Sequence, residues 1–196
     1  MKNTLSLPDR YLITPEPDAS SADAFLACLE QALKAGITLV QLRSKSMSAG
    51  RYALLATQAL DLCHTFNARL IVNHAAFTRD TPGADGVHLS SRHLMAQPQR
   101  PFSGDMLFSA SCHNAAQLLQ AQALDADFVT LSPVLQTRTH PDASPLGWDV
   151  FAALVSETST SVYALGGMER VHIAKAQSAG AIGIAAIGSL WPGPRG

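Results

Sequence analysis

The feature that most constrains the fold of this chain is a repeated unit, in which a short apolar run gives way to polar or glycine residues. Eight such runs occur, at residues 10–14, 37–42, 69–72, 85–89, 107–110, 128–131, 162–165 and 182–187. Between several of them, apolar side chains recur at helical spacing, at residues 21–36, 48–66, 114–124 and 169–180. Alternation of this kind predicts parallel strands joined by helical crossovers.

Eight strand–helix units fit a single (β/α)8 TIM barrel spanning residues 1–196, with its functional groups at the C-terminal ends of the strands. The alternative is an open doubly wound sheet, which the absence of a GxGxxG motif after the first strand disfavours. The crossovers after the third and fourth strands are too short for full helices. The tail at 190–196 is short and rich in Pro and Gly, so a truncated last helix is expected.

Composition limits the partners of the chain. With 47% hydrophobic and 15% charged residues and a net charge of -1, nothing favours disorder, nucleic acid or an anionic membrane surface. No apolar run approaches a membrane span, and the N-terminus lacks a signal-peptide pattern. Cys28, Cys63 and Cys112 are scattered without metal-ligand spacing. The expected location is the cytoplasm.

The sixth run ends at Ser132-Pro133 in a polar loop that carries Thr137, Arg138, Thr139 and His140. Two hydroxyls, a guanidinium and an imidazole so close together suit a phosphorylated or other anionic ligand. The alternative is a surface loop that is merely polar.

Glycines follow the last two strands, at Gly166-Gly167 and Gly188-Ser189, where barrels of this type build phosphate sites. Glycine lets backbone N–H groups close on a phosphate, and the start of the next helix adds its dipole. The alternative is that both pairs only turn the chain.

Gln41, Arg43 and Lys45 alternate at the end of the second strand, and period two would place them on one face. If that face is the barrel mouth, they form a cationic wall with one amide, suited to a second anionic group or a heteroaromatic ring. A solvated surface is the alternative.

Five of the seven histidines fall at or just past predicted strand ends, at His74, His88, His93, His113 and His140. Together they could bind a divalent ion such as Zn²⁺ or transfer protons. His74, His93, His113 and His140 are the candidate catalytic residues, and His74 and His93 the candidate metal ligands. Alternatively, several point outward or cap loops.

The ordered motifs YLIT, VQLRSK, ADGVHL, LSPVLQTRTH, ALGG and GAIGIAAIGS, spanning Tyr11 to Ser189, resemble those of the thiamine phosphate synthase/TenI family. The chain looks most like the TenI-like domain fused to MutT-type Nudix hydrolases, although no Nudix box is present. The resemblance implies a barrel that joins a pyrimidine pyrophosphate to a thiazole phosphate. The residues it carries over to substrate contacts are Gln41, Arg43, Lys45, Asn73, Ser111, Thr137, Thr139, Gly166 and Gly167; Gly188 and Ser189 replace the serine that ends strand eight.

Three further departures concern catalysis. The two Mg²⁺-binding aspartates of the family fall at His74 and His93, and the lysine that meets the departing pyrophosphate falls at His140. Imidazole is a poor ligand for Mg²⁺, which prefers carboxylate or water oxygen. The acid-base histidine of the TenI tautomerases would align near Ser132-Pro133, where there is none.

Three functions remain open. The first, which these departures favour, is a barrel that binds a phosphorylated thiazole- or pyrimidine-type ligand with its synthase metal ligands replaced. The second is an active synthase, which would require Mg²⁺. The third is a non-catalytic sensing or interaction domain related to Nudix fusions. No cofactor is certain, and a homodimer is left open.

Overall fold

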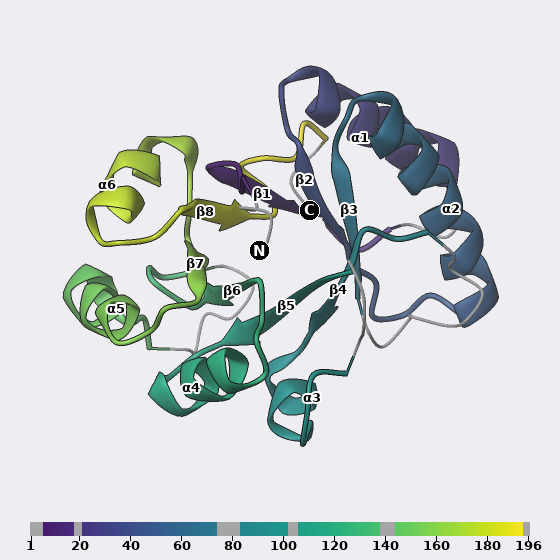
Figure 1. Cartoon of the computed structure of the whole chain (residues 1–196). Helices are drawn as coiled ribbons and strands as arrows, with labels where there is room; N and C mark the ends of the chain where they lie inside the picture. Colours follow the sequence, from purple (N-terminus) through teal and green to yellow (C-terminus); the bar gives the residue numbers. More distant parts are fainter. Residues whose placement is uncertain (1–5, 18–20, 74–82, 102–105, 138–143, 194–196) are drawn as a thin grey trace.

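Eight parallel strands form a closed barrel in sequence order, with β8 paired to β1, in a computed structural model that describes residues 6–17, 21–73, 83–101, 106–137 and 144–193 (Figure 1). The strands are β1 (Arg10–Ile13), β2 (Leu39–Leu42), β3 (Arg69–Asn73), β4 (Gly86–Leu89), β5 (Leu107–Cys112), β6 (Phe128–Leu131), β7 (Ser161–Ala164) and β8 (Gly183–Ala186). The predicted TIM barrel is confirmed.

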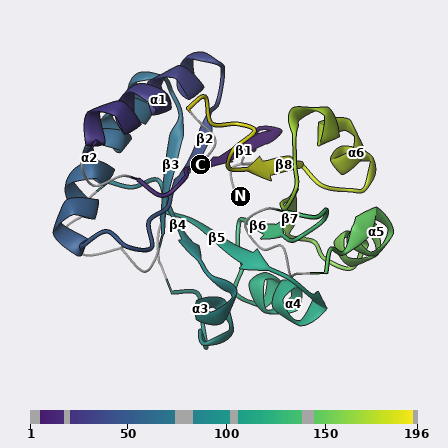
Figure 2. The same ribbon diagram turned by 180° about the vertical axis from the view of Figure 1, so that it is seen from behind.

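Helices surround the strands on the outside of the barrel, as the view from behind also shows (Figure 2). They are α1 (Ala22–Lys34), α2 (Ala49–Thr65), α3 (Ser91–Met95), α4 (Ala115–Ala123), α5 (Gly147–Ser156), the 3-10 helix η2 (Arg170–His172) and α6 (Ile173–Ser178). Among the described residues, no helix is long and apolar enough to cross a membrane.

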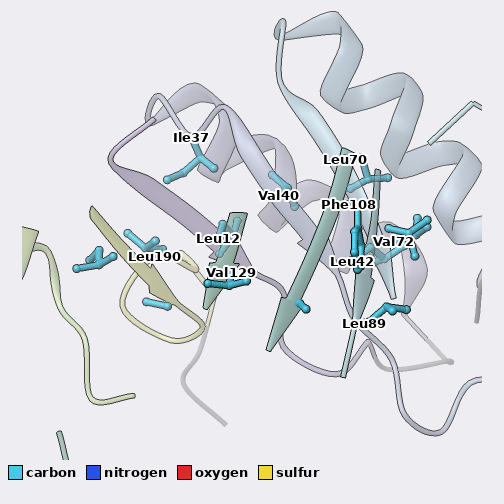
Figure 3. Close-up of a cluster of buried hydrophobic side chains, with 14 of the residues drawn as sticks. Leu12, Ile37, Val40, Leu42, Leu70, Val72, Leu89, Phe108, Val129 and Leu190 are labelled. Atoms are coloured by element: carbon cyan, nitrogen blue, oxygen red, sulfur yellow. The ribbon is translucent and has the colours of Figure 1, made fainter. Parts of the chain in front are cut away.

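Alternation along each strand divides the apolar side chains between two cores. Outward residues such as Val40, Leu70 and Val129 pack beneath the helices (Figure 3). Inward residues fill the barrel, where the Tyr11 ring meets Phe128 edge-on with centroids 5.3 Å apart. Because every strand is covered on both faces, the runs are continuously apolar instead of alternating with polar residues.

The expected irregularities of the barrel are present where the structure describes them. The crossover after β4 holds only the five-residue α3, and the described residues after β8 form a turn at 188–190 with no helix. Most of the crossover after β3 lies outside the described residues. The helix α5 was not among the elements expected from the sequence. Ser21 and Ser48 begin the helical segments expected at residues 21–36 and 48–66 and directly precede α1 and α2, but neither side chain makes a capping hydrogen bond.

Candidate functional site

The C-terminal ends of all eight parallel strands meet at one mouth of the barrel. Most of the predicted ligand residues lie there: Gln41 in β2, Asn73 at the end of β3, Ser111 in β5, and the glycine segments directly after β7 and β8. Thr137, in the β6–α5 loop, is the last residue described before the gap at 138–143. His74, Arg138, Thr139 and His140 lie outside the described residues, so their predicted roles stay predictions.

The glycines after β7 are required by the protein's own packing. Gly166 and Gly167 have φ angles of 97° and 68°, in the left-handed region that favours glycine. A Cβ on Gly167 would lie 2.6 Å from the carbonyl oxygen of Gln136, and one on Gly166 would lie 2.7 Å from the Cα of Pro133. The β6–α5 loop therefore lies directly against the β7–α6 loop. A phosphate-binding role at this position is compatible with that packing and stays a prediction.

Hydrogen bonds join the loops on this side of the mouth. The Val134 N–H donates to the carbonyl of Leu165 at 2.9 Å, and the Leu135 N–H donates to that of Gly166 at 3.1 Å. The Ser189 hydroxyl donates to the carbonyl of Met168 at 2.8 Å and links the turn after β8 to the β7–α6 loop. Three successive loops thus form one connected wall.

The opposite side of the mouth is the loop between β2 and α2, which carries Arg43 and Lys45. β2 ends at Leu42, so strand alternation does not extend to these two cations, and their placement on one face with Gln41 stays a prediction. The loop is instead held by the β1–α1 segment: the Arg43 N–H donates to the Thr14 hydroxyl at 3.1 Å, and the Lys45 N–H donates to Glu16. The sequence reasoning assigned no role to Glu16.

Gln41 is inside the barrel, where its side chain is buried and its Nε2 has no hydrogen-bond partner among the described residues. The Thr130 Oγ1 is buried and unpaired in the same sense. Burial raises the pKa of the Tyr11 hydroxyl, and Ser109 and Gln41 lie close enough to oppose that rise. Buried polar atoms are normally paired with protein, water or ligand, so the Gln41 amide and the Thr130 hydroxyl are available to one. This supports Gln41 as a ligand residue. Tyr11 and Thr130 were not selected from the sequence as site residues, because both lie within apolar runs that predict strands.

His88 lies inside the barrel, on β4, and does not reach out into the mouth. It is buried, with Nδ1 2.9 Å from the Ser109 hydroxyl and Nε2 2.8 Å from the Ser111 hydroxyl. Burial, followed by the positive charge of Arg43, lowers the pKa of His88 to about 3, so the ring is neutral near pH 7. Arg43 therefore brings positive charge near His88.

The two other described histidines of the predicted set are engaged separately. His93 is in α3, and its Nδ1 lies 3.0 Å from the hydroxyl of the N-cap residue Ser90. His113 follows β5, and its Nδ1 lies 2.8 Å from the carbonyl of Ser132. Within the described ranges, no three His, Cys, Asp or Glu side chains form a metal-binding group. His93 thus contacts the N-cap residue of its own helix, and the catalytic roles expected for His93 and His113 stay predictions.

Comparison with known proteins gives the family. The family model described as thiamine monophosphate synthase matches residues 10–190, nearly the whole barrel. The chain belongs to the thiamine monophosphate synthase family.

Two curated proteins that are similar to this chain carry the name of the family. A Geobacter sulfurreducens protein named "Putative thiamine-phosphate synthase" is 37% identical over 94% of this chain and 87% of its own length. The thiamine-phosphate synthase of Chloroflexus aurantiacus is 31% identical over 92% of this chain and 84% of its own length. The family-level resemblance seen in the motifs is thereby confirmed, and it places the chain among the transferases of thiamine biosynthesis.

The fold of the family is also found in solved structures. Thiamine phosphate pyrophosphorylase from Pyrococcus furiosus superposes with a TM-score of 0.70 at 22% identity, covering 91% of this chain and 85% of its own. A 3-hexulose-6-phosphate synthase superposes with a TM-score of 0.58 at 14% identity, covering 90% and 88%. At these identities the likeness concerns the barrel alone.

The metal chemistry of the synthase family does not fit the described residue at position 93. The motif resemblance leads one to expect a Mg²⁺-binding carboxylate there, whereas this chain has an imidazole whose Nδ1 lies 3.0 Å from the Ser90 hydroxyl. Mg²⁺ takes oxygen ligands in octahedral geometry, and an imidazole offers none. Position 74, the other expected carboxylate, is also a histidine and lies outside the described residues.

Proposed function

We propose that this barrel binds a phosphorylated ligand such as thiazole phosphate or thiamine phosphate, and that Mg²⁺-dependent thiamine phosphate formation is absent or very weak. The observation that carries the proposal is His93, whose ring contacts the α3 N-cap where the family places a metal carboxylate. Without a metal, little remains to stabilise a leaving pyrophosphate, which corresponds to roughly a thousandfold loss of rate or more.

Ligand binding is supported by what the chain retains. Gln41 has a buried amide nitrogen without a partner, His88 and Ser111 form a polar pair below the mouth, and Arg43 brings positive charge beside them. On the other side, the loops after β7 and β8 are joined through Ser189. A heteroaromatic group could occupy the polar centre, while anionic groups meet the cationic loop or the glycine loops.

Binding is tested by thermal unfolding and calorimetry with thiazole phosphate, thiamine phosphate and pyrimidine pyrophosphate, each with and without Mg²⁺. A ligand present at about 100 times its Kd should stabilise the protein by ~2.7 kcal/mol. The dephosphorylated thiazole should protect much less than thiazole phosphate. Equal protection by the two compounds contradicts phosphate recognition.

An active synthase is the second candidate, favoured by the curated relatives. The Chloroflexus aurantiacus protein is named a thiamine-phosphate synthase and matches over nearly the whole barrel. Turnover of thiazole phosphate and pyrimidine pyrophosphate with Mg²⁺ distinguishes the two candidates. Robust turnover by the unmodified chain refutes the loss of activity.

The relation to TenI-like domains of Nudix fusions stays a prediction, as does the sensing role derived from it. A sensing domain should bind thiamine phosphate without converting it, and should change the activity of a Nudix hydrolase when the two are mixed. No effect on such a hydrolase would remove this third possibility.

A further inference from the structure

The carboxylate of Glu16 is the most heavily hydrogen-bonded side chain at the mouth. It accepts from the Ser44 and Ser46 hydroxyls at 2.6 and 2.8 Å. It also accepts from the backbone N–H of Lys45, at 2.9 Å to Oε1 and 2.8 Å to Oε2, and from the backbone N–H of Ser46 at 3.0 Å. Two consecutive backbone N–H groups and two hydroxyls thus converge on one carboxylate.

This arrangement resembles an anion-binding turn in which the bound anion is a carboxylate of the same chain, that of Glu16. Successive backbone N–H groups pointing at one spot attract negative charge. Burial alone would raise the pKa of Glu16, but the hydrogen bonds from Ser44, Ser46 and Lys45 outweigh it and lower the pKa to about 2. The carboxylate is therefore ionised near neutral pH, where it can accept all of these hydrogen bonds.

The turn held by Glu16 lies 28–30 residues away along the chain and belongs to the cationic loop. Thr14, two residues before Glu16, accepts the Arg43 N–H at 3.1 Å, while Lys45 itself is exposed. The β1–α1 segment therefore fixes this loop at three backbone positions, since the Arg43, Lys45 and Ser46 N–H groups donate to it directly. The Ser44 hydroxyl also accepts a hydrogen bond from the Met47 N–H at 3.1 Å, which holds one more residue of the loop in place.

We propose that Glu16 is a positioning residue, which holds the β2–α2 loop so that Arg43 and Lys45 are ready to bind the second anionic group of the ligand. This rests on the proposed function, because it requires that the mouth binds a phosphorylated ligand. Glu16 itself touches no ligand in this role. Its contribution is to lower the entropy that the loop would otherwise lose on binding.

The direction in which anion affinity changes when Glu16 is removed distinguishes a positioning role from a purely electrostatic one. Glu16 is a negative charge beside two cations, so removing it should strengthen the binding of an anion if charge alone matters. If positioning matters, removal lets the loop leave its binding-competent form. A competent fraction of about one tenth weakens the apparent affinity about tenfold.

The test compares the unmodified chain with Glu16→Ala for two probes, inorganic pyrophosphate and thiazole phosphate, titrated by calorimetry. We expect Glu16→Ala to bind pyrophosphate about tenfold more weakly. The affinity for thiazole phosphate, expected at the glycine loops across the mouth, should change less than about twofold. Formate added to Glu16→Ala should refill the turn and restore pyrophosphate binding, whereas in the unmodified chain formate can only compete with the probe.

Glu30→Ala is the matched control, because it removes an α1 surface glutamate that pairs with Lys34 at 2.7 Å. It should bind both probes like the unmodified chain, with no response to formate.

Equal or tighter pyrophosphate binding by Glu16→Ala overturns the positioning role, as does an equal loss of affinity for both probes, which would make Glu16 purely structural. An unmodified chain that binds thiazole phosphate but not pyrophosphate overturns this inference alone. An unmodified chain that binds neither probe overturns the proposed function, and the role of Glu16 with it.

Discussion

Substituting Gly167 by alanine should destabilise the barrel, while the same change at Gly188 should not. Gly167 has φ of 68°, and its added Cβ would lie 2.6 Å from the Gln136 carbonyl oxygen and 2.8 Å from the Leu135 Cβ. Gly188 has no atom within 4 Å of an added Cβ and does not have a positive φ. The two glycines follow neighbouring strands, so they form a matched pair.

The magnitude has two parts. An L-residue held in the left-handed region costs about 1–2 kcal/mol. Relieving the contact with Gln136 requires the β6–α5 loop to move, which breaks the hydrogen bond from the Leu135 N–H to Gly166 and costs about 1 kcal/mol more. The expected loss of stability is therefore ~2–3 kcal/mol, or a fall in Tm of roughly 4–12 °C for a domain of this size. Gly188→Ala should stay within about 0.5 kcal/mol of the unmodified chain.

Thermal and urea unfolding of the three proteins measure this difference directly. A titration with thiazole phosphate adds the functional comparison, since Gly167→Ala should also displace the loop that faces the predicted phosphate. A Gly167→Ala protein as stable as Gly188→Ala refutes the packing of the β6–α5 loop against Gly167. A destabilised protein that still binds thiazole phosphate with unchanged affinity places the phosphate elsewhere.

Three further predictions concern the substituted metal positions and two ionisable groups. The combined change His74→Asp, His93→Asp and His140→Lys should raise Mg²⁺-dependent thiamine phosphate formation above that of the unmodified chain; no gain would mean that the divergence extends to the pocket shape. The pKa of His88 is lowered to about 3 from its ordinary 6.5, so between these two pH values only the unfolded chain takes up the proton. The free energy of unfolding should therefore fall by up to ~1.4 kcal/mol for each pH unit as the pH is lowered from about 6.5 towards 3. Chemical denaturation measures this dependence, and an equally steep loss in His88→Asn would contradict it. The pKa of Glu16 is lowered to about 2 from 4.5, so its contribution to stability should be complete above pH 4.5 and should disappear as the pH falls through 2. Glu16→Gln should lack this dependence when unfolding is measured across that pH range.

The fold was predictable because its signals are local. The continuous apolar runs that give way to polar or glycine residues predict buried parallel strands, and the structure places all eight where the runs occur. Strand ends differed by one or two residues, as at β2, which begins at Leu39 where the apolar run begins at Ile37. Gly36, with φ of 84°, follows α1 as the predicted stop signal.

The site was predictable only in part. Once the strands are parallel, their C-terminal ends share one mouth, so the location of Gln41, Asn73 and Ser111 followed from their positions in the sequence. The direction of a side chain beyond the strand end did not follow, because alternation stops with the strand. Arg43 and Lys45 were therefore grouped on one face by a rule that no longer applied to them.

The sequence by itself determined the barrel, its open mouth and the residue types that surround it, because periodicity and strand order are encoded locally. Only the tertiary structure decided which of these groups meet: Glu16 with Ser44 and Ser46, His88 between two serines of β5, and Gly167 against Gln136. Each contact joins residues that are 21 to 31 positions apart on successive strands or loops. Such pairs come together only when the strands align in register and the barrel closes, and no periodicity in the sequence records that alignment.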